Sequence, residues 1–133
     1  MNKLLSSKEN VAIGIIAGDE DRQFYENISL AIVNDSRLLK FGCDNSVDDF
    51  IAFIYLSDKI FTSDSLAMHI STALKKYTVV ITGPTSFTEL DVFGSGAVIY
   101  SNKVDCLCCY LNTCDKAVTC MNTVDADEVV KFL

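Results

Sequence analysis

The sequence has few basic residues and no basic cluster. Its 133 residues include 11 Lys and Arg against 18 Asp and Glu, which gives a formal net charge of −7. The longest basic run is the pair Lys75-Lys76. Because nucleic acids and anionic membrane surfaces are bound chiefly through lysine and arginine, the composition argues against DNA, RNA or an anionic membrane as a partner.

The sequence also lacks a long apolar run. No stretch approaches the roughly 20 apolar residues that a helix needs to span a bilayer. Residues 1–16 carry charges and serines within their apolar stretch, unlike a signal or transit peptide. We therefore expect no transmembrane segment, and we expect a soluble chain in the cytoplasm.

Half of the residues are apolar and 22% are charged, a composition that excludes a disordered chain. A chain of this length corresponds to one domain and buries roughly two-thirds of its unfolded surface. Neither an internal repeat nor a linker interrupts the sequence. We therefore predict a single domain over residues 1–133.

Apolar runs alternate with amphipathic segments along the chain. The run from Val11 to Ala17 is typical of a strand buried on both faces of a parallel sheet. Residues 1–8 have the pattern of a helix end with no strand before it, so we expect the fold to lack its first strand. Such alternation predicts an α/β fold with a Rossmann-like, three-layer parallel sheet. Further strands are expected at 38–41, 59–62, 77–82 and 97–100, and helices at 19–34, 46–55, 64–75 and 125–133.

Three segments follow predicted strands, at the edge where open parallel sheets bind ligands: 17–20, 63–69 and 82–85. In the middle segment Asp64 or Ser63 can cap the following helix, whose first-turn amides can bind a phosphate. Ser65 and His69 are four residues apart and share a helix face near that end. A hydroxyl and an imidazole beside free amides suit a diphosphate. An ordinary helix cap and a packed histidine are the alternative interpretation.

The stretch from Phe61 to Gly94 resembles the heptosyltransferase family, glycosyltransferase family 9. That family carries an aspartate–serine/threonine–glycine–x–x–histidine motif, an alanine-rich helix, a strand and a glycine–proline–threonine turn in this order. Cysteines, the pair Cys120-Met121 and a closing helix follow, as in the family. Upstream, residues 17–28 are similar to the family's glycine–acid turn after a strand. The resemblance extends over essentially the whole chain.

This resemblance implies the carboxy-terminal half of a GT-B fold, which binds a nucleotide-diphospho-sugar, ADP-heptose in the best-known members. It implies that Asp64, Ser65, Leu66 and His69 lie at the sugar and diphosphate, and Glu20 near the nucleoside. In such inverting enzymes the other half holds the lipopolysaccharide-type acceptor and a carboxylate base. The chain itself then has no catalytic residue and requires no cofactor. Judged by its position alone, an acid such as Glu20 also suits the start of a helix dipole.

The chain departs from the family pattern in three ways. Leu66 stands at the glycine of the motif, where a side chain can crowd a phosphate. The family's first strand with its basic phosphate contact, and the whole acceptor half, have no counterpart in the sequence. We therefore expect the chain to be catalytically inactive alone, and to self-associate or bind a chain that supplies the rest. The alternative is a non-catalytic α/β module that has lost donor binding.

Six cysteines are present, five of them close together. A structural zinc ion takes four ligands, which this loop offers as Cys106, Cys109, Cys114 and Cys120. A metal-binding or redox domain is thus a third hypothesis. Ordinary free thiols are the alternative, whereas stable disulfides are disfavoured in a reducing compartment. A catalytic cysteine is disfavoured because His69 is the only histidine with which it could pair.

Overall fold

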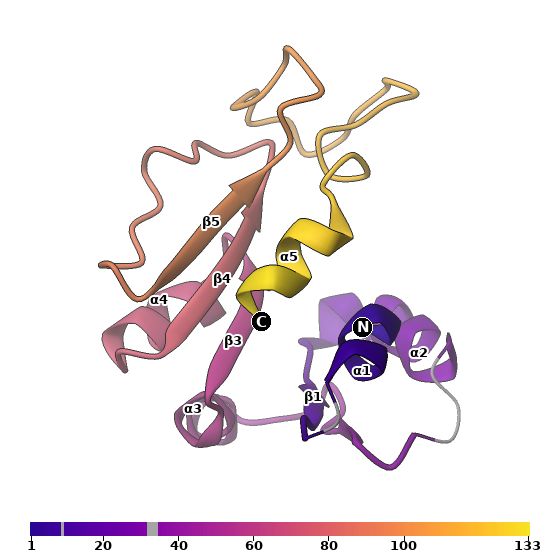
Figure 1. The fold of residues 1–133 in the computed structure, drawn as a ribbon, viewed down its shortest axis with the longest axis vertical. Coiled ribbons are helices and arrows are strands. Elements are labelled where there is room, and N and C mark those ends of the chain that lie inside the picture. The colour runs from indigo at the N-terminus through magenta and orange to yellow at the C-terminus, as the bar shows by residue number, and fades with distance from the viewer. Residues whose placement is uncertain (9, 32–34) are drawn as a thin grey trace. The chain divides into compact units, whose positions relative to one another are not determined.

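The computed structural model describes residues 1–8, 10–31 and 35–133. They divide into two compact units, Met1–Phe53 and Ile54–Leu133. Each unit combines helices with parallel strands (Figure 1). Among the described residues, no helix has the length and apolarity of a membrane span.

The first unit is built on two short parallel strands, β1 (Ile13–Ile15) and β2 (Leu38–Lys40). Helix α1 (Asn2–Ser7) contributes Leu5 to a small core with Leu38, and half-buried residues of β1 pack against both. The core of this unit therefore depends on a few side chains.

Two further helices belong to the first unit in whole or in part. A 3-10 turn, η1 (Asp19–Asp21), leads into α2 (Arg22–Ala31). The predicted end of this helix, at 32–34, lies outside the described residues. Helix α3 (Val47–Leu56) begins after Ser46, whose hydroxyl accepts the Asp49 N–H at 3.1 Å, so the predicted cap is confirmed.

Arg37 joins separate segments of the first unit. Its Nη2 and Nε donate to the carboxylate of Asp35, at 2.7 and 3.0 Å. Its Nη1 donates to the carbonyl oxygens of Leu5 and Lys8 at the end of α1, at 2.9 and 3.0 Å. Carbonyls at a helix end have no partner within the helix, so a guanidinium there is favourable. Arg37 therefore fixes α1 to the start of β2 by polar contacts.

The second unit contains a three-stranded parallel sheet in the order β3-β4-β5. Its strands are β3 (Lys59–Ser63), β4 (Tyr77–Thr82) and β5 (Gly96–Tyr100). The central strand β4 is rich in β-branched residues, which favour the extended backbone. Val79 and Val80 point to opposite faces of the sheet, and both are fully buried.

Helices cover both faces of this sheet. Helix α5 (Ala126–Phe132) packs Val129 against Val79 and Ile99. Helix α4 (Leu66–Ala73) contacts β3 and β4, and the Thr78 hydroxyl of β4 donates to the Ser71 hydroxyl of α4 at 2.9 Å. Alternate residues of β4 therefore face α5 and α4, which gives the second unit a three-layer arrangement (Figure 1).

The predicted α/β fold with parallel strands is confirmed, but some details of the prediction are wrong. The strand expected at 11–17 spans only three residues, and Gly14 at its centre is exposed rather than buried on both faces. The five strands are divided between two sheets, of two and three strands. The helix expected at 64–75 ends at Ala73, because Lys75 adopts a left-handed conformation (φ 57°) that terminates it.

Candidate functional site

The junction between β3 and α4 carries four of the five predicted donor-binding residues. Ser65 is the N-cap of α4 and has an extended backbone. Its hydroxyl makes no capping hydrogen bond and instead pairs with the Thr62 hydroxyl at 2.9 Å. The prediction that Asp64 or Ser63 caps this helix is therefore wrong, because the helix begins later than expected. Among the described residues, no side chain caps the start of α4. Its first-turn amides can therefore donate to a ligand, except that of Met68, which donates to the Ser65 carbonyl.

The start of α4 faces solvent. Asp64 and His69 are exposed, and Ser65 is half-buried. Leu66, the first residue of the helix, is 59% exposed, so its side chain is not packed over the helix end as a plug. An exposed helix N-terminus attracts anions through its amides and its dipole. An ionised Asp64 carboxylate can accept hydrogen bonds but cannot donate one. It therefore suits a ligand hydroxyl rather than a phosphate oxygen.

Glu20 belongs to the first unit, so the five predicted residues are divided between the two units. It lies exposed in η1, after the carboxyl end of β1. Beside it in sequence, the Arg22 guanidinium donates to Asp19 at 2.7 Å and to Asp44, and these bonds raise the pKa of Arg22. Arg22 is thus already paired with carboxylates of its own unit.

Pairs of hydroxyl groups occur at the carboxyl ends of all three strands of the second sheet. After β3, Thr62 pairs with Ser65; after β4, the Thr82 and Thr85 hydroxyls lie 2.7 Å apart. After β5, the hydroxyl of Thr123 donates to that of Ser101 at 2.8 Å. Sequence reasoning missed these pairs, although a Thr or Ser three residues after a strand-end Thr is a readable signal for the first two. They line the sheet edge with neutral polar groups.

The structure does not bring the four predicted zinc ligands together. Among the described residues, no three His, Cys, Asp or Glu side chains are grouped so that they could hold a metal ion. Cys109 and Cys114 are exposed, Cys106 is half-buried, and Cys120 is buried; all are free thiols. Hydrogen bonding to Cys106 raises the pKa of Lys116, so this thiol has a lysine as its neighbour.

Comparison with known proteins shows what the sequence is similar to. Over 108 residues, 80% of this chain, the sequence is 32% identical to lipooligosaccharide heptosyltransferase 2 of Campylobacter jejuni. This chain is related to the heptosyltransferases. The match covers 32% of that relative, so the chain spans about a third of its length. No protein-family profile matches the chain.

The fold of this chain also matches a solved structure, that of E. coli ADP-heptose LPS heptosyltransferase II. The TM-score is 0.64 at 20% sequence identity, over 78% of this chain and 32% of that chain. At this identity the match concerns the fold alone. Together the two comparisons confirm the predicted resemblance to the heptosyltransferase family and the Rossmann-like α/β architecture.

Proposed function

We propose that this chain binds a nucleotide-diphospho-sugar and forms the donor-binding part of a glycosyltransferase of the heptosyltransferase type. In this proposal it acts in the cytoplasm, and the sugar goes to a lipopolysaccharide-type acceptor. The observation that carries the proposal is the solvent-facing start of α4, which follows β3 at the carboxyl edge of the sheet. Within the described part of the chain, no side chain caps this helix start.

Each residue at this junction has a chemical role in the proposal. The first-turn amides of α4 hold the diphosphate. The Asp64 carboxylate accepts hydrogen bonds from sugar hydroxyls, and His69, one turn into α4, donates to a phosphate or sugar oxygen.

The proposed reaction inverts the anomeric carbon. A carboxylate base, supplied by an acceptor-binding part, removes the proton of the acceptor hydroxyl. The resulting oxygen forms a bond to the anomeric carbon as the bond from that carbon to the diphosphate breaks. The amides of α4 stabilise the negative charge that develops on the leaving diphosphate. Because we assign no base to this chain, we expect it to release no nucleoside diphosphate alone with donor and acceptor.

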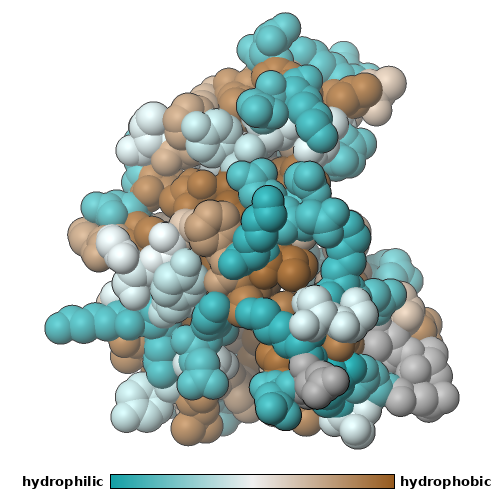
Figure 2. Space-filling model, viewed as in Figure 1, coloured by the Kyte–Doolittle hydropathy of each residue, from teal (hydrophilic) through white to brown (hydrophobic). Residues whose placement is uncertain are grey.

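A partner surface is part of the proposal. Large apolar side chains are exposed on the chain, including Leu56 and Phe93, each 77% exposed. Hydrophobic residues are visible among hydrophilic ones on the face shown in Figure 2. Exposed apolar area of this kind favours association. We therefore expect the chain to self-associate or to bind an acceptor-binding chain, which sedimentation of the purified protein measures.

The proposal is tested by titrating the chain with ADP-, UDP- and GDP-sugars. His69 is the only histidine, so its imidazole resonances report binding near α4 without overlap. Leu66→Glu places a carboxylate at the first position of α4, where it favours the helix dipole and repels a diphosphate. We expect donor binding to be lost in this variant while thermal stability is kept.

Leu56→Glu is the matched control. It makes the same charge change at an exposed leucine, but Leu56 precedes β3 and so lies at the amino edge of the sheet. Binding by this variant should equal that of the wild type. If no sugar nucleotide at millimolar concentration shifts the His69 resonances, or if Leu66→Glu binds as well as the wild type, donor binding at α4 is refuted.

A further inference from the structure

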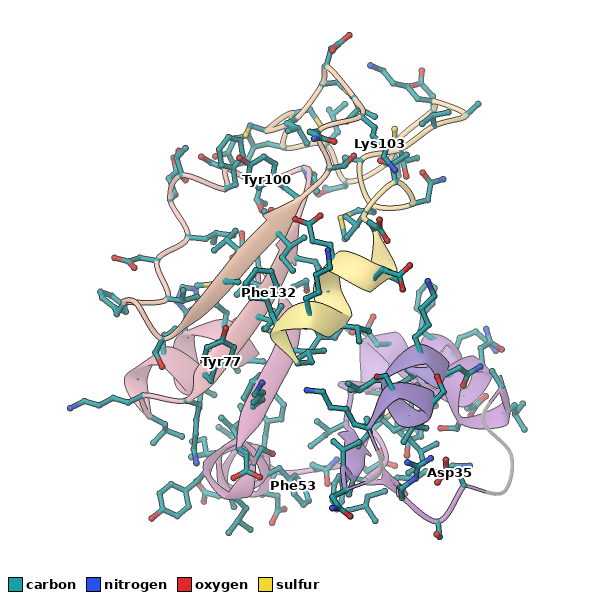
Figure 3. All side chains as sticks on the ribbon, viewed as in Figure 1. Asp35, Phe53, Tyr77, Tyr100, Lys103 and Phe132 are labelled. Atoms are coloured by element: carbon teal, nitrogen blue, oxygen red, sulfur yellow. The ribbon has the colours of Figure 1, made fainter. Side chains whose placement is uncertain are left out.

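The thiol-rich loop between β5 and α5 is fixed where it leaves and returns to the sheet. We call residues 102–122 the strap. The strap begins after Ser101, the residue that follows β5. Figure 3 labels Tyr100, the last residue of β5, and Lys103, near the start of the strap. Its far end is held by Thr123, whose hydroxyl donates to that of Ser101 at 2.8 Å. Ser101 is only 3% exposed, so both ends of the strap meet at one buried point.

The middle of the strap docks on the Gly83–Pro84 turn that follows β4. The backbone N–H of Cys108 donates to the Gly83 carbonyl at 3.0 Å, and that of Tyr110 donates to the Pro84 carbonyl at 2.8 Å. Both donor residues have left-handed backbones, with φ of 58° and 55°. Residues other than glycine disfavour this conformation, so the docked strap is strained and depends on its contacts with the turn.

Cys120 makes the closest of these contacts. It is buried, at 9% exposed, and its sulfur lies against Gly83 where a side chain of any other residue would be. A methyl group on Gly83 would overlap the Cys120 sulfur and come within 3.2 Å of the Met121 sulfur. There is therefore no room for an additional atom on Gly83, or on the side of the Cys120 sulfur that faces Gly83.

We propose that Cys120 controls whether the strap is docked. Addition of a group to the Cys120 sulfur releases the strap from the Gly83–Pro84 turn. The co-reactant is a low-molecular-weight disulfide. The Cys120 thiolate attacks one sulfur of this disulfide, a new S–S bond forms, and the original S–S bond breaks. The departing thiolate takes up a proton equivalent to the one that Cys120 lost. Cys120 is thereby oxidised and the departing half of the reagent is reduced.

Release of the strap changes the carboxyl edge of the sheet at β4, beside the end of β3. The docked and released forms differ in whether the Cys108 and Tyr110 amides are hydrogen-bonded to the turn. These amides are therefore the readout, and the inference stands independently of donor binding.

The first experiment measures hydrogen exchange at the Cys108 and Tyr110 amides before and after treatment with 2-hydroxyethyl disulfide. In the wild type we expect exchange to accelerate at least about tenfold after treatment, and dithiothreitol to restore it. In the control variant Cys120→Ala the other five cysteines still react, and we expect no acceleration. Equal acceleration in both proteins, or intact protection in a wild type modified at Cys120, overturns the proposal.

The second experiment measures the rate at which iodoacetamide alkylates each cysteine. In the wild type Cys120 should react as slowly as Cys43, which is 7% exposed and lies in the first unit, while the exposed Cys109 reacts quickly. Gly83→Ala should raise the Cys120 rate at least about tenfold and leave Cys43 unchanged.

Gly18→Ala is the control for this variant, because a side chain at Gly18 has nothing within 4 Å and its backbone is extended. It should change neither rate. If the ratio of the Cys120 alkylation rate to the Cys43 rate is unchanged in a folded Gly83→Ala variant, the proposed role of Cys120 is contradicted. If Gly83→Ala exposes both thiols by unfolding, the comparison of the wild type with Cys120→Ala decides the matter.

Discussion

The two compact units are both built from helices and parallel strands, yet they are stabilised differently. In the first unit the strands have three residues each, and the best-buried core side chains, Leu5 and Cys43, are 7% exposed. Both arginines of the chain lie there, and both pair with aspartates. In the second unit Val79 and Val80 are fully buried in a three-stranded sheet. The exposed Arg22–Asp19 pair and the half-buried Arg37–Asp35 pair contribute less to stability than the burial of apolar side chains, so the second unit should be the more stable.

The largest effect is expected from Gly96 in the second unit. Its φ of 156° and its position in β5, directly against the Thr78 carbonyl of β4, leave no room for a side chain. Gly96→Ala should lower the free energy of unfolding by about 4 kcal/mol or more, because the strands must separate. Gly94→Ala, with a φ of 73° and nothing within 4 Å, should cost only about 1 kcal/mol. Urea unfolding measures both, and equal losses contradict the assigned register.

A pair of core truncations tests whether the units unfold separately. Val79→Ala leaves a cavity beside the buried side chains of Ile99 and Val129 and should lower the stability of the second unit by about 2–3 kcal/mol. Leu5→Ala removes more atoms, but its half-buried neighbours can collapse into the space, so about 2 kcal/mol is expected in the first unit. Hydrogen exchange in β4 and in β1 measures the two effects. If each substitution accelerates exchange equally in both strands, the chain is one cooperative unit and the comparison fails.

The sequence predicted the second unit better than the first, for a physical reason. The β-branched run at 77–82 is typical of a strand and is followed by a clear stop signal at Gly83, and β4 has the predicted bounds. The apolar run at 11–17 carries the same signal as a buried strand, but β1 pairs only over Ile13–Ile15. Pairing length is decided by the partner strand, which the sequence of one strand does not contain.

The candidate site was also predicted only in part. The spacing of Asp64, Ser65 and His69 located the start of α4 within two residues. The spacing could not reveal that Thr62 binds the Ser65 hydroxyl, because that contact depends on how the chain turns after β3. For the same reason the four cysteines at zinc-like spacing are separated: packing of Cys120 against Gly83 competes with any common centre.

Leu66 tests the proposed site at the start of α4, which belongs to the second unit. Leu66→Gly gives the α4 start the glycine of the family pattern and removes an exposed side chain next to the free amides. We expect donor affinity to rise about three- to tenfold, an increase equivalent to about 0.7–1.4 kcal/mol. Stability should fall, because glycine disfavours a helix. Calorimetric titration measures affinity, with Leu56→Gly as the exposed-leucine control; unchanged affinity would mean that Leu66 does not crowd the diphosphate.

The smallest effect is expected from acid, and it should distinguish the first unit from the second. Hydrogen bonds from Arg37 lower the pKa of Asp35 below its value in the unfolded chain. A carboxyl group with a lowered folded-state pKa stabilises the fold above the unfolded pKa, and this contribution is lost as the pH falls through the folded pKa. Exchange in β1 and β2 should therefore accelerate as the pH drops below about 4, after correction for intrinsic rates. Asp35→Asn should remove this pH dependence while leaving β4 unaffected. An acid response of the same size in β4 would assign it to other carboxylates and remove Asp35 as its cause.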